Sequence, residues 1–160
     1  MTQKRNKAIH LAKPSPEISS LKMDLYRHCR AILAECLRSG NWLAAIVIEE
    51  SIISDRIESV MAKLNVDLNI NSLGENIDNF RKHANRSDPK YFEILKSLES
   101  WSRERNYAIH MLVKTHDGEN LNWEERIDRV RIAALDGEKL VAELNNWARR
   151  KVNRYPTNKI

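Results

Sequence analysis

Apolar residues recur every three or four positions along most of this chain, which is the spacing of helices that bury one face. The pattern predicts a first helix that begins after the Pro-Ser-Pro segment and ends before Gly40, a residue common just past a last helical turn. Its apolar positions are Leu21, Leu25, Cys29, Ile32 and Cys36. Asn41 is a suitable N-cap for a second helix over 42–64. The apolar positions of that helix are Leu43, Ile46, Ile53, Ile57, Val60 and Leu64.

Three further helices are predicted in the second half of the chain. A short helix covers 72–84, and the next begins at Pro89 after the capping residue Asp88 and extends to Lys114. The last pattern keeps its spacing through Gly137, so we predict one long helix despite a cost of about 1 kcal/mol for the glycine. Its positions are Ile127, Val130, Ala134, Gly137, Val141, Leu144 and Ala148. The small residues among them indicate a close helix crossing.

The composition agrees with this helical pattern. Glycine and proline number four each, 42% of the residues are apolar, and no segment alternates as a strand would. The 160 residues are enough for one domain with a real core. We therefore predict an all-α bundle of about five helices over 16–154, with a basic tail over 1–15 and a second tail over 155–160.

Charge and cysteine content narrow the choice of compartment and partner. The net charge of +5 permits a polyanionic partner such as RNA without demonstrating one. The basic N-terminal segment lacks an apolar core of signal-peptide length, and no run approaches the roughly 20 apolar residues of a membrane span. A cytoplasmic protein is expected. Cys29 and Cys36 share a helix face but lie roughly 10 Å apart, too far for a disulfide, so we interpret them as small core residues.

One six-residue pattern occurs twice, as RNKAIH over 5–10 and as RNYAIH over 105–110. The spacing of arginine and histidine is weak evidence alone, so the context of each copy decides its interpretation. The first copy lies in an unpatterned basic tail, where nothing holds the two side chains in fixed geometry, and we interpret it as coincidence. The second copy lies within a strongly patterned helix.

In that helix, Arg105 falls near the middle of the apolar stripe. A buried guanidinium costs several kcal/mol unless it is paired, so a partner is expected. On a helical wheel of the second helix, Glu50 lies on the apolar face, whereas Glu49 lies at the edge of that face. We therefore predict a Glu50–Arg105 ion pair. Such a pair could serve structure alone, by fixing the register of two helices, or it could belong to a functional site.

His110 favours the functional interpretation, although a solvent-exposed helix histidine with no role remains an alternative. A histidine moves protons near neutral pH, and an arginine stabilises the charge of a developing phosphorane. Together with a carboxylate, these groups suit general acid–base attack on a phosphodiester.

The segment RNYAIH, in the fourth helix of a small all-α chain, resembles the Arg, polar residue, three residues, His motif of the HEPN superfamily, the higher eukaryote and prokaryote nucleotide-binding domain. The segment EESIISDRIE is similar to an acidic stretch of many members, and the resemblance spans 21–148. It implies a helical bundle that dimerises, and a metal-independent ribonuclease of a toxin–antitoxin, CRISPR-associated or phage-defence system. Some toxin members carry a modified Tyr two residues after the His, whereas this chain has Leu112 there.

The resemblance also implies a role for each motif residue. Arg105 would stabilise the transition state and His110 would act as acid and base. Asn106 would orient the phosphate or the histidine, and Glu50 would orient Arg105. Because five helical residues turn through about 500°, Arg105 and His110 point about 140° apart. Either a second subunit packed along this helix or a local kink would bring the two groups together. We expect that interface to bury Tyr107, His110 and Met111.

Other chemistry has little support in the sequence. His110, His116 and Asp117 match no familiar metal site, and the chain has no glycine-rich phosphate loop, so neither a metal nor a cofactor is predicted. Further candidates for RNA contact are Arg103, Arg149, Arg150, Lys151 and Arg154. There are two functional hypotheses. The first is an endoribonuclease whose partners are RNA and a cognate antitoxin or regulator protein. The second is a non-catalytic helical dimer that binds nucleic acid or protein.

Overall fold

The computed structural model describes residues 16–63, 72–83, 89–110, 112–114 and 121–154, and the described residues form five α-helices and no strand. The helices are α1 (Pro16–Ser39), α2 (Trp42–Lys63), α3 (Leu73–His83), α4 (Pro89–His110) and α5 (Trp123–Arg154). The prediction of an all-α bundle of about five helices is confirmed. No described helix is both long enough and apolar enough to span a membrane.

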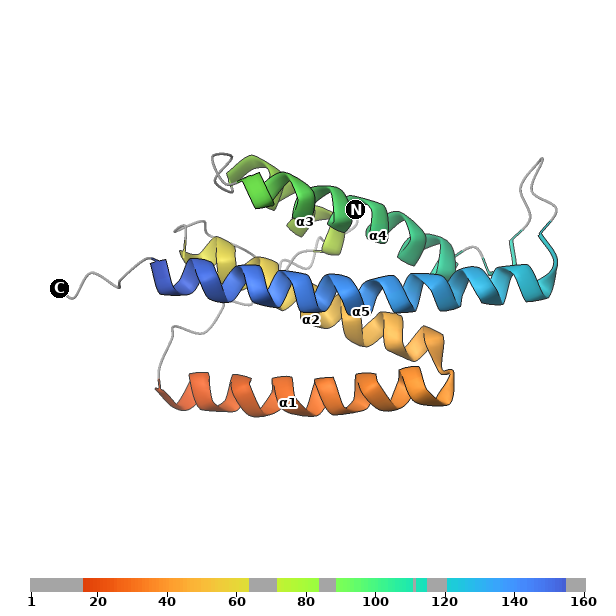
Figure 1. Ribbon diagram of the computed structural model, residues 1–160, viewed down its shortest axis with the longest axis horizontal. Coiled ribbons are helices and arrows are strands. Elements are labelled where there is room, and N and C mark those ends of the chain that lie inside the picture. The colour runs from red at the N-terminus through yellow and green to blue at the C-terminus, as the bar shows by residue number, and fades with distance from the viewer. Residues whose placement is uncertain (1–15, 64–71, 84–88, 111, 115–120, 155–160) are drawn as a thin grey trace, which may run out of the picture.

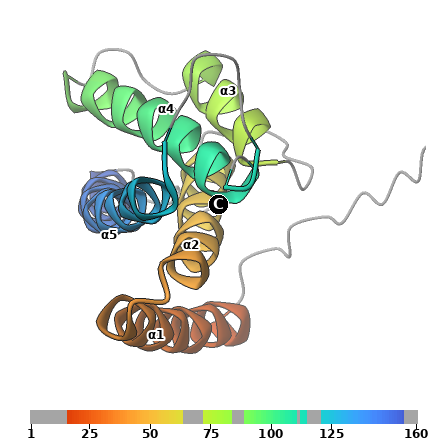
Figure 2. The ribbon, with the colours of Figure 1, turned by 90° about the vertical axis from the view of Figure 1, so that its right-hand side faces the viewer.

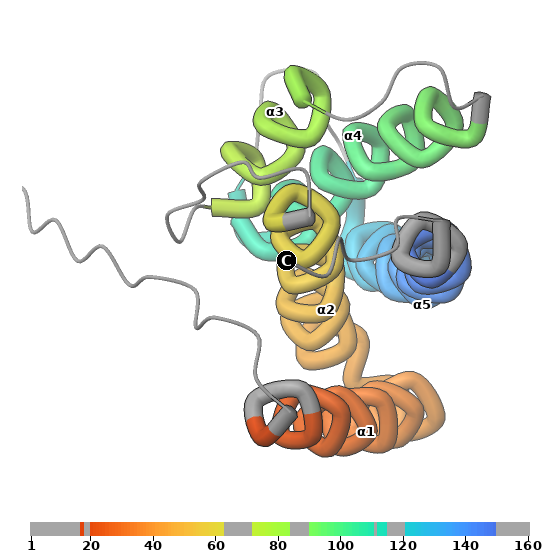
Figure 3. The backbone as a smooth tube through the Cα atoms, turned by 90° about the vertical axis from the view of Figure 1, so that its left-hand side faces the viewer, coloured from red at the N-terminus to blue at the C-terminus, as the bar shows by residue number. Residues whose placement is uncertain are grey.

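Helix α2 lies at the centre of the bundle and contacts each of the other four helices. Figure 1 shows α5 along the length of the molecule, with α1 on one side and α3 and α4 on the other, and Figure 2 shows α2 between α1 and the α3–α4 pair. The tube in Figure 3 shows the same arrangement from the opposite end. Ile46, Ile53 and Ile57 of α2 are fully buried, and they belong to the same core cluster as Val141 and Leu144 of α5.

Gly137 lies where α5 crosses α2 and α4, and the predicted unbroken helix through it is confirmed. A Cβ atom at this position would lie 2.6 Å from Cδ of Glu49 and 2.7 Å from Nε1 of Trp101. Real Cβ contacts are longer, so the crossing requires a residue without a side chain. The Nε1 group of Trp101 donates a hydrogen bond of 2.9 Å to the Ala133 carbonyl, which fixes α4 on α5 at this point.

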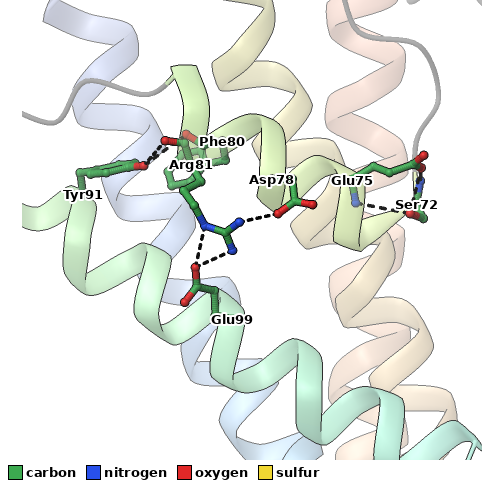
Figure 4. A network of polar contacts seen from close by, with 7 residues as sticks. All are labelled: Ser72, Glu75, Asp78, Phe80, Arg81, Tyr91 and Glu99. Carbon is green, nitrogen blue, oxygen red and sulfur yellow. Dashed lines mark hydrogen bonds and ion pairs between the residues drawn. The ribbon is translucent and has the colours of Figure 1, made fainter.

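Local hydrogen bonds define where the helices begin and end. Gly40 adopts φ = 75°, and the Asn41 amide donates to the Cys36 carbonyl at 2.8 Å, which closes α1 in the manner of a Schellman motif. Helix α3 begins with a capping box, in which the Ser72 amide donates to Glu75 at 2.7 Å and the Glu75 amide donates to the Ser72 hydroxyl (Figure 4).

Helix α3 is tied to α4 by polar contacts at its C-terminal end. Arg81 donates to Glu99 through Nε at 3.0 Å and Nη2 at 2.8 Å, and the Tyr91 hydroxyl donates to the Arg81 carbonyl at 3.0 Å (Figure 4). The rings of Phe80 and Tyr91 pack beneath these contacts with centroids 5.2 Å apart. These contacts set the direction of α4, the helix that carries the second hexapeptide.

Helix α4 ends at His110, so the prediction that it extends to Lys114 is wrong. The buried guanidinium of Arg126 explains the difference. It donates to the Lys114 carbonyl at 2.9 Å and to the Leu121 carbonyl at 3.1 Å. These hydrogen bonds from α5 bind two carbonyl groups of the segments between α4 and α5.

Helix α1 departs from its predicted packing. Leu21, Leu25 and Ile32, which the pattern assigns to an apolar face, are 55–59% exposed, and the helix packs on α2 through Leu33 and Cys36. The pattern identifies an apolar face but not whether another helix covers it. Both cysteines are free, with Cys36 buried and Cys29 half-buried, as expected of small core residues.

Candidate nucleic-acid site

The predicted Glu50–Arg105 ion pair joins α2 to α4. Nε of Arg105 donates to Oε2 of Glu50 at 2.8 Å, and Nη2 contacts the same oxygen. The Arg105 side chain is 19% exposed and that of Glu50 24% exposed, so the pair lies at the rim of the core rather than within it. The prediction of the pair is confirmed, and its depth is less than the helical wheel suggested.

Glu49 is the carboxylate that the core encloses, and its predicted position at the edge of the apolar face is wrong. Glu49 is fully buried, and within the described residues neither carboxylate oxygen has a hydrogen-bond partner. Burial, with a smaller contribution from the Glu138 carboxylate, raises the pKa of Glu49 to about 8. The helical wheel misplaced Glu49 because it assumes that only one face of the helix is buried, whereas other helices pack on several sides of α2.

Asn106 extends the ion pair toward the surface. Nη1 of Arg105 donates to Oδ1 of Asn106 at 2.6 Å. Because this bond occupies the amide oxygen, the Nδ2 group of Asn106 is the part left to donate to a ligand. Glu50, Arg105 and Asn106 thus form one hydrogen-bonded chain from α2 to an exposed position on α4.

Asn106 leads into an open cleft with a volume of about 520 Å³ between α4 and α5. Its lining residues are Arg103, Glu104, Asn106, Tyr107, His110 and Arg129. Four of the five α4 residues follow the spacing of one helix face, from 103 through 106 and 107 to 110. The cleft therefore gathers an acid–base side chain, an amide and two guanidinium groups on one surface.

Arg129 is the contribution of α5 to this cleft, and sequence analysis missed it. Glu104 accepts hydrogen bonds from Nε of Arg129 at 2.8 Å and from Nη2 at 3.3 Å. The guanidinium carbon lies 3.5 Å from the ring centroid of Tyr107. Nothing in the spacing of apolar residues indicates which α5 residue meets the hexapeptide, so no sequence signal could have identified Arg129.

Arg105 does not belong to the set of described residues that line the cleft, in agreement with the divergence expected of residues five apart on a helix. Arg105 is connected to the residues of the cleft through its hydrogen bond to Asn106. His110 is exposed and Tyr107 is half-buried under Arg129, so of the three residues expected at a dimer interface Tyr107 already has an intrachain neighbour.

The remaining candidates lie elsewhere. Arg149 is exposed and lies about 30 Å along α5 from Arg129, at 1.5 Å per residue. The structure does not describe the first hexapeptide copy or Asp88, nor Met111, His116 and Asp117, nor the side chains of Arg150, Lys151 and Arg154. Among the residues that it describes, no group of three or more His, Cys, Asp or Glu side chains could hold a metal ion.

Replacing Glu50 tests the ion pair. Glu50→Ala is expected to lower the free energy of unfolding by about 1–2 kcal/mol, less than for a fully buried pair, because water can reach part of Arg105. Chemical denaturation at pH 7 measures this change. Glu35→Ala is the matched control, since Glu35 forms an exposed pair with Arg38 on α1 and should change stability by less than about 0.5 kcal/mol. Equal losses would show that the Glu50–Arg105 pair adds nothing.

Comparison of this chain with protein-family models, with curated proteins and with solved structures found no match. The resemblance of the second hexapeptide to the HEPN motif is therefore not supported by any related protein. The arrangement of Glu50, Arg105 and Asn106 beside the His110 cleft carries the functional argument by itself.

Proposed function

We propose that this chain is a metal-independent endoribonuclease of HEPN type that acts as a toxin or phage-defence effector in the cytoplasm. The observation that carries the proposal is the cleft. His110, Asn106 and Arg103 line it from one face of α4, and Arg129 lines it from α5. A cationic cleft attracts the phosphate backbone of RNA, and its imidazole can accept and donate a proton.

The proposed reaction needs only groups that this cleft can supply. Neutral His110 takes the proton of a ribose 2′-OH as the O2′–P bond forms and the P–O5′ bond breaks, which leaves a 2′,3′-cyclic phosphate. The departing 5′-oxygen takes a proton from a second imidazole or from water. Asn106 Nδ2, Arg103 and, from a second subunit, Arg105 bind the phosphate oxygens, where negative charge increases in the transition state.

A test of the nuclease uses the purified chain with EDTA present. Cleavage of single-stranded RNA should persist at the same rate with and without the chelator, since histidine and arginine carry the proposed chemistry. The 5′-side products should end in a 2′,3′-cyclic phosphate, which mass spectrometry identifies by the loss of one water relative to the linear monophosphate. Loss of cleavage on addition of EDTA would contradict the mechanism.

The divergence of Arg105 and His110 favours a twofold dimer through the end of α4. A second subunit packed there would place its histidine and arginine beside those of the first. Val113 is 86% exposed and Trp123 56% exposed in the segments that follow α4 and begin α5, so apolar surface exists at this end of the bundle. Light scattering at micromolar concentration should give about twice the 18.7 kDa chain mass. A monomer would remove the composite site.

One observation favours a second function. Arg105 forms an internal ion pair and does not line the cleft, as would suit a non-catalytic helical dimer that binds nucleic acid or a protein regulator. In that case the chain would bind RNA in a salt-dependent manner and leave it intact, with or without divalent cations.

A further inference from the structure

Arg129 is held more firmly than a surface arginine usually is. Its guanidinium carbon lies 3.5 Å from the centroid of the Tyr107 ring, and Glu104 accepts hydrogen bonds from Nε at 2.8 Å and from Nη2 at 3.3 Å. The ring and the carboxylate together restrict the side chain to few rotamers, so much of the rotamer entropy of a free arginine is lost before any ligand binds.

The same side chain remains accessible from the cleft. Arg129 is 36% exposed and lines the cleft together with Tyr107 and His110. Because Tyr107 covers the guanidinium on one side, a ligand in the cleft would approach it from the side turned away from the ring. A clamp between α4 and α5 alone would not need that exposure, because Trp101 already ties these helices through its bond to the Ala133 carbonyl.

We infer that Arg129, stacked on Tyr107 and held by Glu104, is a platform on which one nucleobase of a bound single-stranded RNA stacks. Unstacked RNA bases commonly bind to aromatic rings and to guanidinium planes. The inference rests on the proposed function for the identity of the ligand as RNA.

The platform also lies at the right place to choose where RNA is cut. Tyr107 and His110 are three residues apart on α4, so their Cβ atoms are about 5–6 Å apart on the helix surface. A base on the platform brings its adjoining phosphodiester next to His110. Arg129 thereby sets the nucleotide preference at the cleaved bond, whereas exposed Arg103 contributes attraction to the backbone that does not depend on the base.

Binding to two probes tests the platform apart from cleavage. The probes are a fluorescein-labelled single-stranded RNA and an abasic oligomer of the same length and charge. Their affinities are measured by fluorescence anisotropy on the His110→Ala chain, so that the RNA is not consumed. The RNA should bind about tenfold more tightly than the abasic oligomer, corresponding to one stacked base.

Arg129→Lys in this background keeps the charge and removes the plane. It should bring the RNA affinity down to that of the abasic oligomer and leave the latter unchanged. Tyr107→Leu should have the same effect and Tyr107→Phe should have little, so the conclusion does not depend on one variant. Arg131→Lys is the matched control, because Arg131 lies on the same helix in an exposed pair with Asp128.

The inference is overturned if the His110→Ala chain binds both probes with equal affinity. It is also overturned if Arg129→Lys lowers the affinity for both probes by the same factor, which would make Arg129 a phosphate contact only. Cleavage by the chain with His110 intact separates this outcome from the proposed function. If the parent and Arg129→Lys both cut RNA with the same nucleotide preference, the platform is wrong and the nuclease stands. If RNA is not cut but base-dependent binding requires Arg129, the platform stands and the nuclease is wrong.

Discussion

His110→Ala is expected to reduce RNA cleavage by about 100-fold or more, because it removes the imidazole that takes the 2′-OH proton in the proposed reaction. Arg105→Ala should lose a comparable factor, since it removes a guanidinium and also releases Asn106. Single-turnover cleavage of a labelled RNA measures both rates. Circular dichroism on the same samples confirms that each variant keeps its helical content.

The first hexapeptide copy is the natural control for these two variants. His10→Ala and Arg5→Ala should cause at most a modest loss of activity that depends on salt, as expected if those residues only attract phosphate. Retention of full activity by His110→Ala, together with a large loss in His10→Ala, would show that the first copy carries the chemistry and the second does not. If the parent chain cuts no RNA, the non-catalytic alternative is favoured; if it cuts RNA and none of the four substitutions slows it, the chemistry belongs to other residues.

The buried carboxyl of Glu49 is expected to make the protein less stable as the pH rises. Its folded-state pKa of about 8 lies above the ordinary value of 4.5, so between these values the unfolded chain loses a proton that the folded chain keeps. The free energy of unfolding should therefore fall by about 3 kcal/mol from pH 5 to pH 8 and level off above the folded pKa. Glu49→Met, which has an unbranched apolar side chain, should not show this fall.

Denaturation of the two proteins at pH 5 and pH 8 isolates the contribution of this carboxyl, because all other titrating groups are shared. The stability of Glu49→Met relative to the parent should increase by about 3 kcal/mol over that interval. Glu35→Met, at an exposed position of α1, should differ from its parent by the same amount at both pH values. Parallel pH profiles for the parent and Glu49→Met would mean that water reaches Glu49 in the folded state.

The two neighbouring glutamates show what could be predicted from sequence. Helical spacing correctly placed Glu50 against Arg105, because opposite charges on two core-facing positions have few other ways to be compensated. The same spacing misplaced Glu49, since its burial depends on Gly137 of α5 and Trp101 of α4, which approach from other helices. Arg129 was missed for the same reason. Helix existence follows from local periodicity, whereas the register between helices follows from tertiary packing.

The attachment of α1 has a consequence for how the molecule opens. This helix is held mainly by α2, through Leu33 and Cys36, and reaches α5 through the hydrogen bond between Tyr26 and Asn145. Its detachment would expose Leu33 and Cys36 but would leave the contacts among α2, α4 and α5 in place. The folded ensemble should therefore include a partly unfolded form in which α1 separates at Gly40 as one cooperative unit, at a lower free energy than global unfolding.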